Sequence, residues 1–241
     1  MPYADIFRKG KYFMKHNREF LSFERVGTEK QRCYYVPFAE KDEPTSVFGI
    51  TDRRSSSEFI SLDGVWKIKQ YPNIDEADVS VCPENEIKVP LSVQMAGYDK
   101  IQYINNRYPF PVIPPITPVD TPCWHYRKTF DLNQRDGRKY YIVLEGVDST
   151  FYLFINGEFK GYSQISHSQS EFDVTELVKN GENVVDARGV KWCVGSYLEC
   201  QDKFRMSGIF RSVYILDRPQ KHIGDYKITT AFSSEKKLLS I

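Results

Sequence analysis

Short segments in which apolar and polar side chains alternate recur from residue 59 onward. A period of two sends successive side chains to opposite faces of a strand, so each segment predicts a β-strand with one buried and one wet face. The predicted strands lie at residues 126–132, 140–145, 151–155, 182–192 and 209–216, on the far side of the Asn156-Gly157 turn up to residue 162, and within 59–71, where an Asp-Gly turn precedes the alternation. Helical periodicity is almost absent, and the best helical candidate is residues 173–181, one or two turns that begin with an aspartate cap and end at a glycine.

Turn signals separate the predicted strands. Asn156-Gly157 lies between two alternating segments and predicts a tight hairpin, because both residue types tolerate the positive φ of a type I′ turn. Short strands joined by turns in this number favour two packed sheets. We therefore predict an all-β fold, a jelly-roll β-sandwich.

The pattern divides the chain into three parts. Residues 1–52 lack sustained periodicity and carry mixed charge with scattered aromatic residues, so we expect an irregular N-terminal arm that lies against a folded body, its own or a neighbouring subunit's. Residues 53–218 hold the predicted strands, and residues 219–241 follow them. Within the sandwich, residues 105–122 contain six of the 13 prolines and several bulky apolar side chains, which indicates an extended loop held on the surface.

Charge and composition exclude several classes of partner. With 33 Lys+Arg against 32 Asp+Glu the net charge is +1, so the chain lacks the basic footprint of nucleic-acid or anionic-membrane binders. No apolar run could span a bilayer and the start has no signal-peptide pattern, so we expect a cytoplasmic location. The cysteines are odd in number, and neither they nor the four isolated histidines show zinc-ligand spacing, which disfavours disulfides and zinc. They are Cys33, Cys82, Cys123, Cys193 and Cys200.

A series of short motifs follows in order through the second half of the chain. They are residues 121–130, 145–149, 156–157, 161–164, 170–173 and 195–211, and the block Arg-Met-Ser-Gly-Ile-Phe-Arg at 205–211 is the most specific. Over roughly residues 55–230 the series resembles the N-terminal sugar-binding domain of the LacZ-type β-galactosidases, glycoside hydrolase family 2. The resemblance implies a galactose-binding-like jelly roll that precedes an immunoglobulin-like domain and a (β/α)₈ barrel.

This resemblance also implies that the chain is the amino-terminal piece of a longer enzyme. Residues 219–241, with a predicted strand at 223–232, look like the first strand of the immunoglobulin-like domain. A retaining glycosidase needs two carboxylates about 5 Å apart, and in this family both are glutamates of the barrel. We therefore expect no catalytic residue in this chain and no activity of the chain alone. Glu199 and Asp202 share one loop, but their neighbours do not select acid and nucleophile roles.

Two residues match substrate-binding positions of the family. Asp202 corresponds to an aspartate that reaches the barrel's active site, where it helps to hold a sodium ion and the galactosyl group. Asn105 corresponds to the asparagine of a Tyr-x-Asn-x-x-Tyr-Pro segment, which approaches the substrate from the Pro-rich loop. Loop capping is the alternative for both side chains. The resemblance favours the binding role, and a carboxylate suits both sodium and sugar hydroxyls.

Some departures from the family bear on metal binding and stability. Val194 and Cys200 stand where close relatives carry acids, so we do not expect magnesium in this chain even though Gln164 is kept; magnesium is expected in the barrel. Asp186 and Arg188 place charges in a sandwich strand, which is costly unless that face is wet or paired, so this strand is predicted to be locally weak.

Other conspicuous residues favour structural roles. Each tryptophan lies in or beside a predicted strand, where core packing is commoner than sugar stacking. These are Trp66, Trp124 and Trp192. Arg205 is expected to pair with an acid, and Glu199 is one candidate.

Three functions remain open from the residues. The leading one is a non-catalytic domain of a homo-oligomeric β-galactosidase that contributes to the galactose subsite and to subunit contacts. The second is a freestanding carbohydrate-binding module, since jelly rolls commonly serve as lectins. The third is a structural assembly fragment without affinity for sugar, which the aromatic arm would suit.

Overall fold

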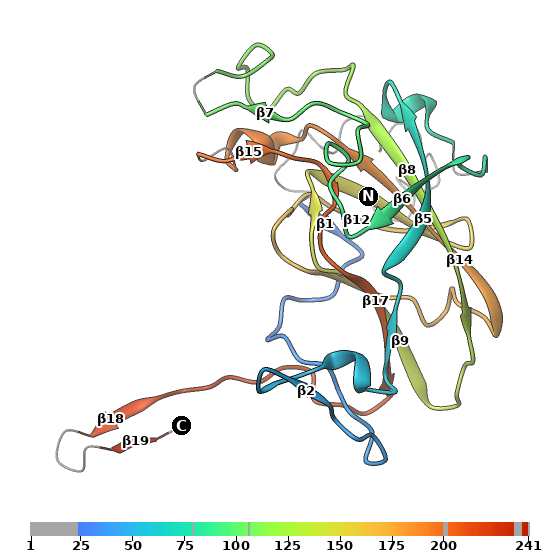
Figure 1. Cartoon of the computed structure of the whole chain (residues 1–241), viewed down its shortest axis with the longest axis vertical. Helices are drawn as coiled ribbons and strands as arrows, with labels where there is room; N and C mark the ends of the chain where they lie inside the picture. Colours follow the sequence, from blue (N-terminus) through green and yellow to red (C-terminus); the bar gives the residue numbers. More distant parts are fainter. Residues whose placement is uncertain (1–23, 79, 106, 200–201, 234–237, 241) are drawn as a thin grey trace, which may run out of the picture.

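Figure 1 shows the computed structural model of the chain, in which antiparallel strands form almost all of the regular structure. The structure describes residues 24–78, 80–105, 107–199, 202–233 and 238–240. Within those ranges, the helical elements are three short 3₁₀ turns, η3 (Arg53–Ser55), η4 (Ile74–Glu76) and η5 (Val194–Tyr197). No helix in the described ranges has the length and apolar character needed to cross a bilayer. The predicted all-β fold is confirmed.

Two sheets form the sandwich. The larger has seven strands in the order β1 (Arg25–Val26), β12 (Glu158–Ser163), β11 (Thr150–Ile155), β14 (Gly181–Val190), β8 (Cys123–Leu132), β5 (Gly64–Tyr71) and β6 (Asn85–Val89). The smaller has four strands in the order β13 (Ser170–Asp173), β9 (Arg138–Leu144), β17 (Val213–Pro219) and β4 (Phe59–Ser61). Strands that are consecutive in the sequence seldom pair with each other, so both sheets depend on hydrogen bonding between distant segments of the chain.

Four two-stranded pairs complete the regular structure. They are β10 (Val147–Asp148) with β16 (Gly208–Ile209), β15 (Phe204–Arg205) with β7 (Gln102–Tyr103), β2 (Ser46–Val47) with β3 (Ile50–Thr51), and β18 (Ala231–Ser233) with β19 (Leu238–Ser240). The β7–β15 pair lies at one end of the sandwich, beside the long loop that follows β7 (Figure 1).

The core lies between the two larger sheets, because alternate side chains of both face the same interior. Trp66, Tyr126 and Leu153 enter it from the seven-stranded sheet, and Ile142 and Ile215 enter it from the four-stranded sheet. All five are almost completely buried. Burying a large apolar side chain contributes about 1.5–3 kcal/mol, so this shared interior stabilises the sandwich.

The outer face of the seven-stranded sheet holds the charged residues that the sequence placed in β14. Asp186 is fully buried and accepts hydrogen bonds from Arg127 Nε at 2.6 Å, with His125 Nε2 also 2.6 Å from the same oxygen. The guanidinium of Arg188 lies 4.9 Å from the ring centre of Phe154. This face is thus paired rather than wet, which satisfies the condition under which a sandwich strand can keep such charges.

The helical candidate at residues 173–181, expected to make one or two turns, is shorter than a regular helix. The segment makes one hydrogen-bonded turn, in which the backbone N–H groups of Leu177 and Val178 both donate to the carbonyl of Val174. Asp173 caps this turn by accepting a hydrogen bond from the backbone N–H of Thr175 at 3.0 Å. Val174 and Val178 are buried in the core, and the chain re-enters the sheet at Gly181, so too few residues remain to propagate a helix.

The predicted strand at residues 223–232 is largely wrong. The backbone from 221 to 230 has no strand assignment, and pairing begins only at Ala231 in the β18–β19 hairpin. That hairpin projects away from the sandwich (Figure 1). A strand requires a partner edge, and Asp225 and Tyr226 instead contact the arm, where they accept hydrogen bonds from the backbone N–H and the Sγ of Cys33.

The described part of the arm, residues 24–52, lies along the body; residues 1–23 fall outside the described ranges. Its strand β1 pairs with β12, and the N–H of Glu29 donates to the carbonyl of Glu171 at 2.8 Å. The carboxylate of Glu171 also joins Arg32 of the arm at 2.5 Å and Arg218 of β17 at 2.8 Å. A buried carboxylate between two guanidinium groups therefore attaches the arm to the four-stranded sheet.

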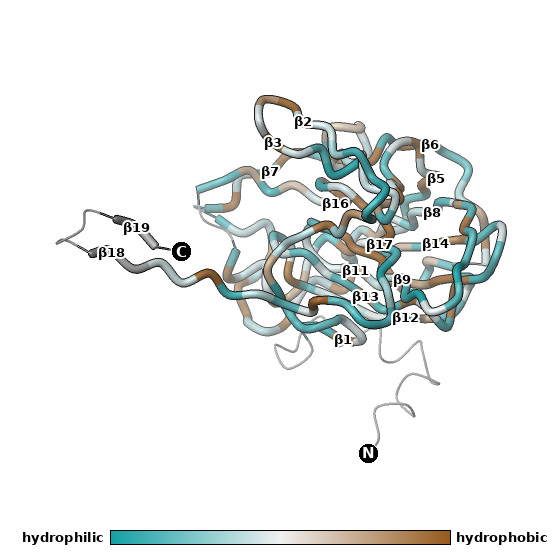
Figure 2. Tube along the Cα trace, turned by 90° about the horizontal axis from the view of Figure 1, so that it is seen from below, coloured by the Kyte–Doolittle hydropathy of each residue, from teal (hydrophilic) through white to brown (hydrophobic). Residues whose placement is uncertain are grey.

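The β2–β3 hairpin within the arm has an apolar tip in solvent. Phe48 has a φ of 52° and is fully exposed, and its neighbours Val47 and Ile50 are exposed as well. Figure 2 shows this tip as a hydrophobic segment on the outside of the molecule. Most other apolar segments face the interior of the sandwich.

Candidate functional site

The two residues predicted to bind substrate lie together, although they are far apart in the sequence. Strand β7 pairs with β15 in the register Tyr103 opposite Phe204, which brings the segment before Asn105 beside the segment after Asp202. The side-chain amide of Asn105 donates to the hydroxyl of Tyr103 at 3.3 Å, and that hydroxyl donates to Oδ1 of Asp202. All three side chains are exposed, so one hydrogen-bonded chain is presented to solvent.

Backbone geometry helps to present Asp202. Its φ is 41°, in the left-handed region that aspartate tolerates better than most residues. The hydrogen bond from Tyr103 raises the pKa of the tyrosine above its usual value, because the nearby carboxylate favours the protonated phenol. Tyr103 therefore remains a donor to Asp202 at neutral pH.

A buried arginine supports this loop from below. Arg205 is 1% exposed, and its Nη2 lies 3.0 Å from Oδ1 of Asp148 and 3.1 Å from the hydroxyl of Ser196. Its Nη1 lies 3.9 Å from a carboxylate oxygen of Glu199. The predicted pairing of Arg205 with an acid is present, and Asp148 is its closer partner.

A second polar chain lies beside the loop. Lys203 Nζ is 3.2 Å from Nε2 of His167, His167 Nδ1 is 2.7 Å from the hydroxyl of Ser166, and that hydroxyl donates to Glu199 at 2.7 Å. Burial first, and then the positive charge of Lys203, lower the pKa of His167 below its usual value. The imidazole is thus neutral at neutral pH, with Nε2 accepting from Lys203 and Nδ1–H donating to Ser166.

Glu199 and Asp202 belong to different hydrogen-bonded groups. Glu199 joins Ser166 and Arg205, whereas Asp202 joins Tyr103.

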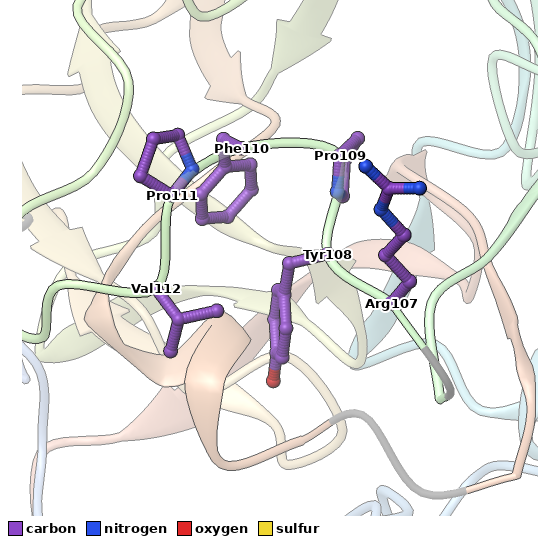
Figure 3. Close-up of a pocket in the computed structure, with 6 residues that line it drawn as sticks. All are labelled: Arg107, Tyr108, Pro109, Phe110, Pro111 and Val112. Atoms are coloured by element: carbon purple, nitrogen blue, oxygen red, sulfur yellow. The ribbon is translucent and has the colours of Figure 1, made fainter.

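The Pro-rich loop is attached to the body through aromatic rings. Phe110 packs against Trp192 with ring centres 5.0 Å apart, Tyr108 packs against Tyr197 at 5.5 Å, and the hydroxyl of Tyr197 donates to the carbonyl of Ile116 at 2.5 Å. Residues 107–112 line a cavity of about 600 Å³, with Tyr108 and Phe110 pointing into the turn of the loop (Figure 3). The loop is pinned to the surface as its bulky side chains predicted.

The three tryptophans are structural, as predicted. Trp66 and Trp124 lie in the main core, and Trp192 is 5% exposed beneath the Pro-rich loop. None of them offers an open ring face on which a sugar could stack.

The structure shows the surroundings of the residues on which the metal-binding predictions depend. In the described ranges, no group of three or more His, Cys, Asp or Glu side chains could hold a metal ion. Val194 is buried in η5, Gln164 is buried with its N–H bonded to the carbonyl of Glu24, and Cys200 falls outside the described residues. The carboxylate of Asp202 is exposed and is joined to the Asn105 amide through the hydroxyl of Tyr103.

Reasoning from the sequence missed Tyr103 and the polar chain beside the loop. Tyr103 carries the contact between the two predicted site residues, and its place in the Tyr-x-Asn segment was the available signal. The chain through Lys203, His167 and Ser166 left no such signal, because its members come from separate segments.

Comparisons with known proteins agree with this architecture. Residues 59–219 match the family model described as glycosyl hydrolases family 2, sugar binding domain. A β-galactosidase of Staphylococcus xylosus is 39% identical over 221 residues, which are 90% of this chain and 22% of that protein. A β-galactosidase of Actinobacillus pleuropneumoniae is 39% identical over 213 residues, 87% of this chain and 21% of that protein. The chain thus spans about a fifth of the length of these relatives.

Solved structures show the same fold at low sequence identity. A β-glucuronidase from an uncultured Clostridium species superposes with a TM-score of 0.57 at 15% identity, over 85% of this chain and 34% of that one. A Bacteroides uniformis β-glucuronidase superposes with a TM-score of 0.51 at 16% identity, over 67% of this chain and 18% of that one. The motif series, the two-sheet fold and the family match agree, and the chain belongs to the sugar-binding-domain family of the family 2 glycosyl hydrolases.

Proposed function

We propose that this chain is the non-catalytic, N-terminal sugar-binding domain of a cytoplasmic β-galactosidase, where Asn105 and Asp202 contribute to the subsite for the galactosyl group of terminal β-D-galactosides such as lactose. The observation that carries the proposal is the hydrogen-bonded chain from Asn105 through Tyr103 to Asp202. The β-galactosidases that match most of this chain support the choice of substrate. Catalysis belongs to the barrel of the full enzyme, so the chain alone hydrolyses no galactoside.

The open groups of the site suit a sugar. Asp202 presents its second carboxylate oxygen, and Asn105 presents its amide oxygen and one remaining N–H. The two oxygens accept hydrogen bonds from hydroxyls and the N–H donates one, and removing a bond to a charged acceptor costs about 1.5–3 kcal/mol. Sugar hydroxyls are donors of this kind.

The same oxygens fit part of a sodium site. Carboxylate and amide oxygens are hard ligands, which alkali cations prefer, but two side chains do not complete a coordination shell. Asp202 would hold the ion together with groups of the barrel. Bound sodium would offset the carboxylate charge and attract a hydroxyl oxygen of the sugar.

We assign the subunit contacts of a homo-oligomer to the N-terminal arm. The exposed apolar tip of its β2–β3 hairpin supports this assignment, because an apolar side chain is rarely left fully exposed at a turn with positive φ.

The test grafts this chain onto a working enzyme. In the graft, this chain replaces the matching 221 residues of the Staphylococcus xylosus β-galactosidase. Turnover of o-nitrophenyl galactoside by the graft is measured in sodium buffer and in potassium buffer. We expect turnover in the graft, a loss of about 10- to 100-fold in kcat/KM for Asp202→Ala, and loss of the sodium response. The control is Asp131→Ala, an exposed aspartate of β8. A folded graft without turnover, or an Asp202→Ala graft with unchanged kinetics, would contradict the proposal.

Calorimetry on the 241-residue chain separates the alternatives. The proposed function predicts no heat with galactose or lactose at low millimolar concentration, since the chain holds only part of the pocket. Binding at that level would favour a freestanding carbohydrate-binding module. An assembly fragment predicts no binding and an Asp202→Ala graft that behaves like the unsubstituted graft.

A further inference from the structure

The hydroxyl of Tyr103 is shared between the two predicted site residues. It accepts a hydrogen bond from the Asn105 amide at 3.3 Å and donates its only proton to Asp202 Oδ1. A phenol has one proton to give, so its donation to the carboxylate leaves only lone pairs toward Asn105. The direction of both bonds is therefore set: amide to hydroxyl, hydroxyl to carboxylate.

This direction determines what the site shows to a ligand. The amide nitrogen of Asn105 is oriented toward Tyr103, so its oxygen is held on the other side of the group. The second oxygen of Asp202 stays open because Oδ1 is occupied. The site presents more acceptors than donors, which suits a neutral polyol and disfavours an anion.

The hydroxyl is separable from the structural contacts of Tyr103. The aromatic ring packs edge-on against Phe204 with ring centres 6.3 Å apart, and the backbone of Tyr103 pairs with Phe204 in the β7–β15 ladder. Neither contact involves the hydroxyl. Tyr103→Phe therefore removes the two hydrogen bonds and keeps the packing.

We propose that Tyr103 is a positioning residue, whose hydroxyl couples Asn105 and Asp202 into one acceptor-rich unit. The coupling acts within this chain. Its effect on galactoside binding rests on the proposed function, in which Tyr103 touches the sugar only through its two neighbours.

The coupling is tested in the 241-residue chain labelled with ¹⁵N. The side-chain amide signals of Asn105, identified by their loss in Asn105→Ser, are followed in wild type, Tyr103→Phe, Asp202→Ala and the double variant. We expect Asp202→Ala to shift the Asn105 signals in wild type and to leave them unchanged in the Tyr103→Phe background. Equal shifts in both backgrounds, or no shift in either, would overturn the proposal.

Folding and nonspecific effects are checked separately. Tyr103→Phe should unfold at the wild-type temperature, since ring and backbone contacts remain. The matched control is Tyr98→Phe, which removes a phenol that donates to the carbonyl of Glu86 at 3.4 Å, and it should leave the Asn105 signals in place.

The grafted enzyme tests the consequence for substrate. We expect Tyr103→Phe to raise KM about 10-fold with little change in kcat, and to add nothing when Asp202→Ala is already present. A further loss in the Asp202→Ala background would show that Tyr103 acts independently, which contradicts the positioning role. If Asp202→Ala itself has normal kinetics, the proposed function fails, while the NMR cycle still decides whether Tyr103 couples the two residues.

Discussion

Removing the buried guanidinium of Arg205 should destabilise the domain more than any surface substitution. Arg205 is 1% exposed and lies 3.0 Å from Oδ1 of Asp148, itself 4% exposed. The variant Arg205→Met fills most of the space but leaves the Asp148 carboxylate without its closest cation. Breaking a buried pair from one side costs about 3–5 kcal/mol. For a domain of this size, about 2–4 °C of melting temperature is lost per kcal/mol, so the midpoint should fall by roughly 6–20 °C.

The assay is urea unfolding followed by tryptophan fluorescence, with Arg54→Met as the matched control. Arg54 pairs with Asp63 at 3.5 Å with a side chain 61% exposed, so its loss should change the free energy of unfolding by at most about 1 kcal/mol. The double variant Arg205→Met with Asp148→Asn should recover part of the lost stability, because no unpaired charge is then buried. A single variant within about 1 kcal/mol of wild type, or a double variant less stable than the single, would refute the reasoning.

Three further predictions concern a buried imidazole, a buried thiol and a backbone turn. Burial lowers the pKa of His167, so the folded state favours the neutral imidazole. The free energy of unfolding should therefore be highest above about pH 6.5, the pKa of an unperturbed histidine, and should decrease as the pH falls toward the lower pKa of the folded state. His167→Gln should reduce this pH dependence in melting curves recorded at different pH values. Burial raises the pKa of Cys193 to about 11, so its thiol should react slowly at pH 8. In a Cys200→Ser background, a thiol reagent should label the exposed Cys33 and Cys82 in the native chain and should label Cys193 only after denaturant is added. Labelling of Cys193 in the native chain would contradict this prediction. Phe48→Asn should raise stability by up to about 1 kcal/mol, because Asn tolerates positive φ before Gly49, and a lower urea midpoint would count against it.

Much of the fold was predictable because its strands carry a strong local signal. The Asn156-Gly157 hairpin has φ values of 52° and 85°, as a type I′ turn requires, and the alternation in residues 126–132 gives a strand that reaches the core through Tyr126. The differences occurred where tertiary context decides. Residues 173–181 carry good helix caps but too short a span, and residues 223–230 alternate without an adjacent strand edge.

The candidate site was predictable only in part. Asn105 and Asp202 came from a resemblance between motifs, and nothing in their local sequence distinguishes a ligand-binding side chain from a loop cap. The contact of their common partner Tyr103 depends on the β7–β15 register. This register joins two segments that are separated in sequence by the Pro-rich loop and four strands of the larger sheet. Such a contact is a property of the folded chain, so no local pattern records it.

The most specific motif, residues 205–211, acquires a physical explanation once its contacts are known. Gly208 has a φ of 98°, and a Cβ there would lie 2.5 Å from the hydroxyl oxygen of core residue Tyr126, so only glycine fits. Ser207 donates its N–H to Gln94 at 2.8 Å, and Ile209 accepts from Leu91 at 2.9 Å, which attaches the motif to the segment after β6. With Arg205 buried at one end, the motif connects the exposed Asp202 loop to the core. Its residue types are thus set by packing, and Asp202, the proposed binding residue, lies just outside it.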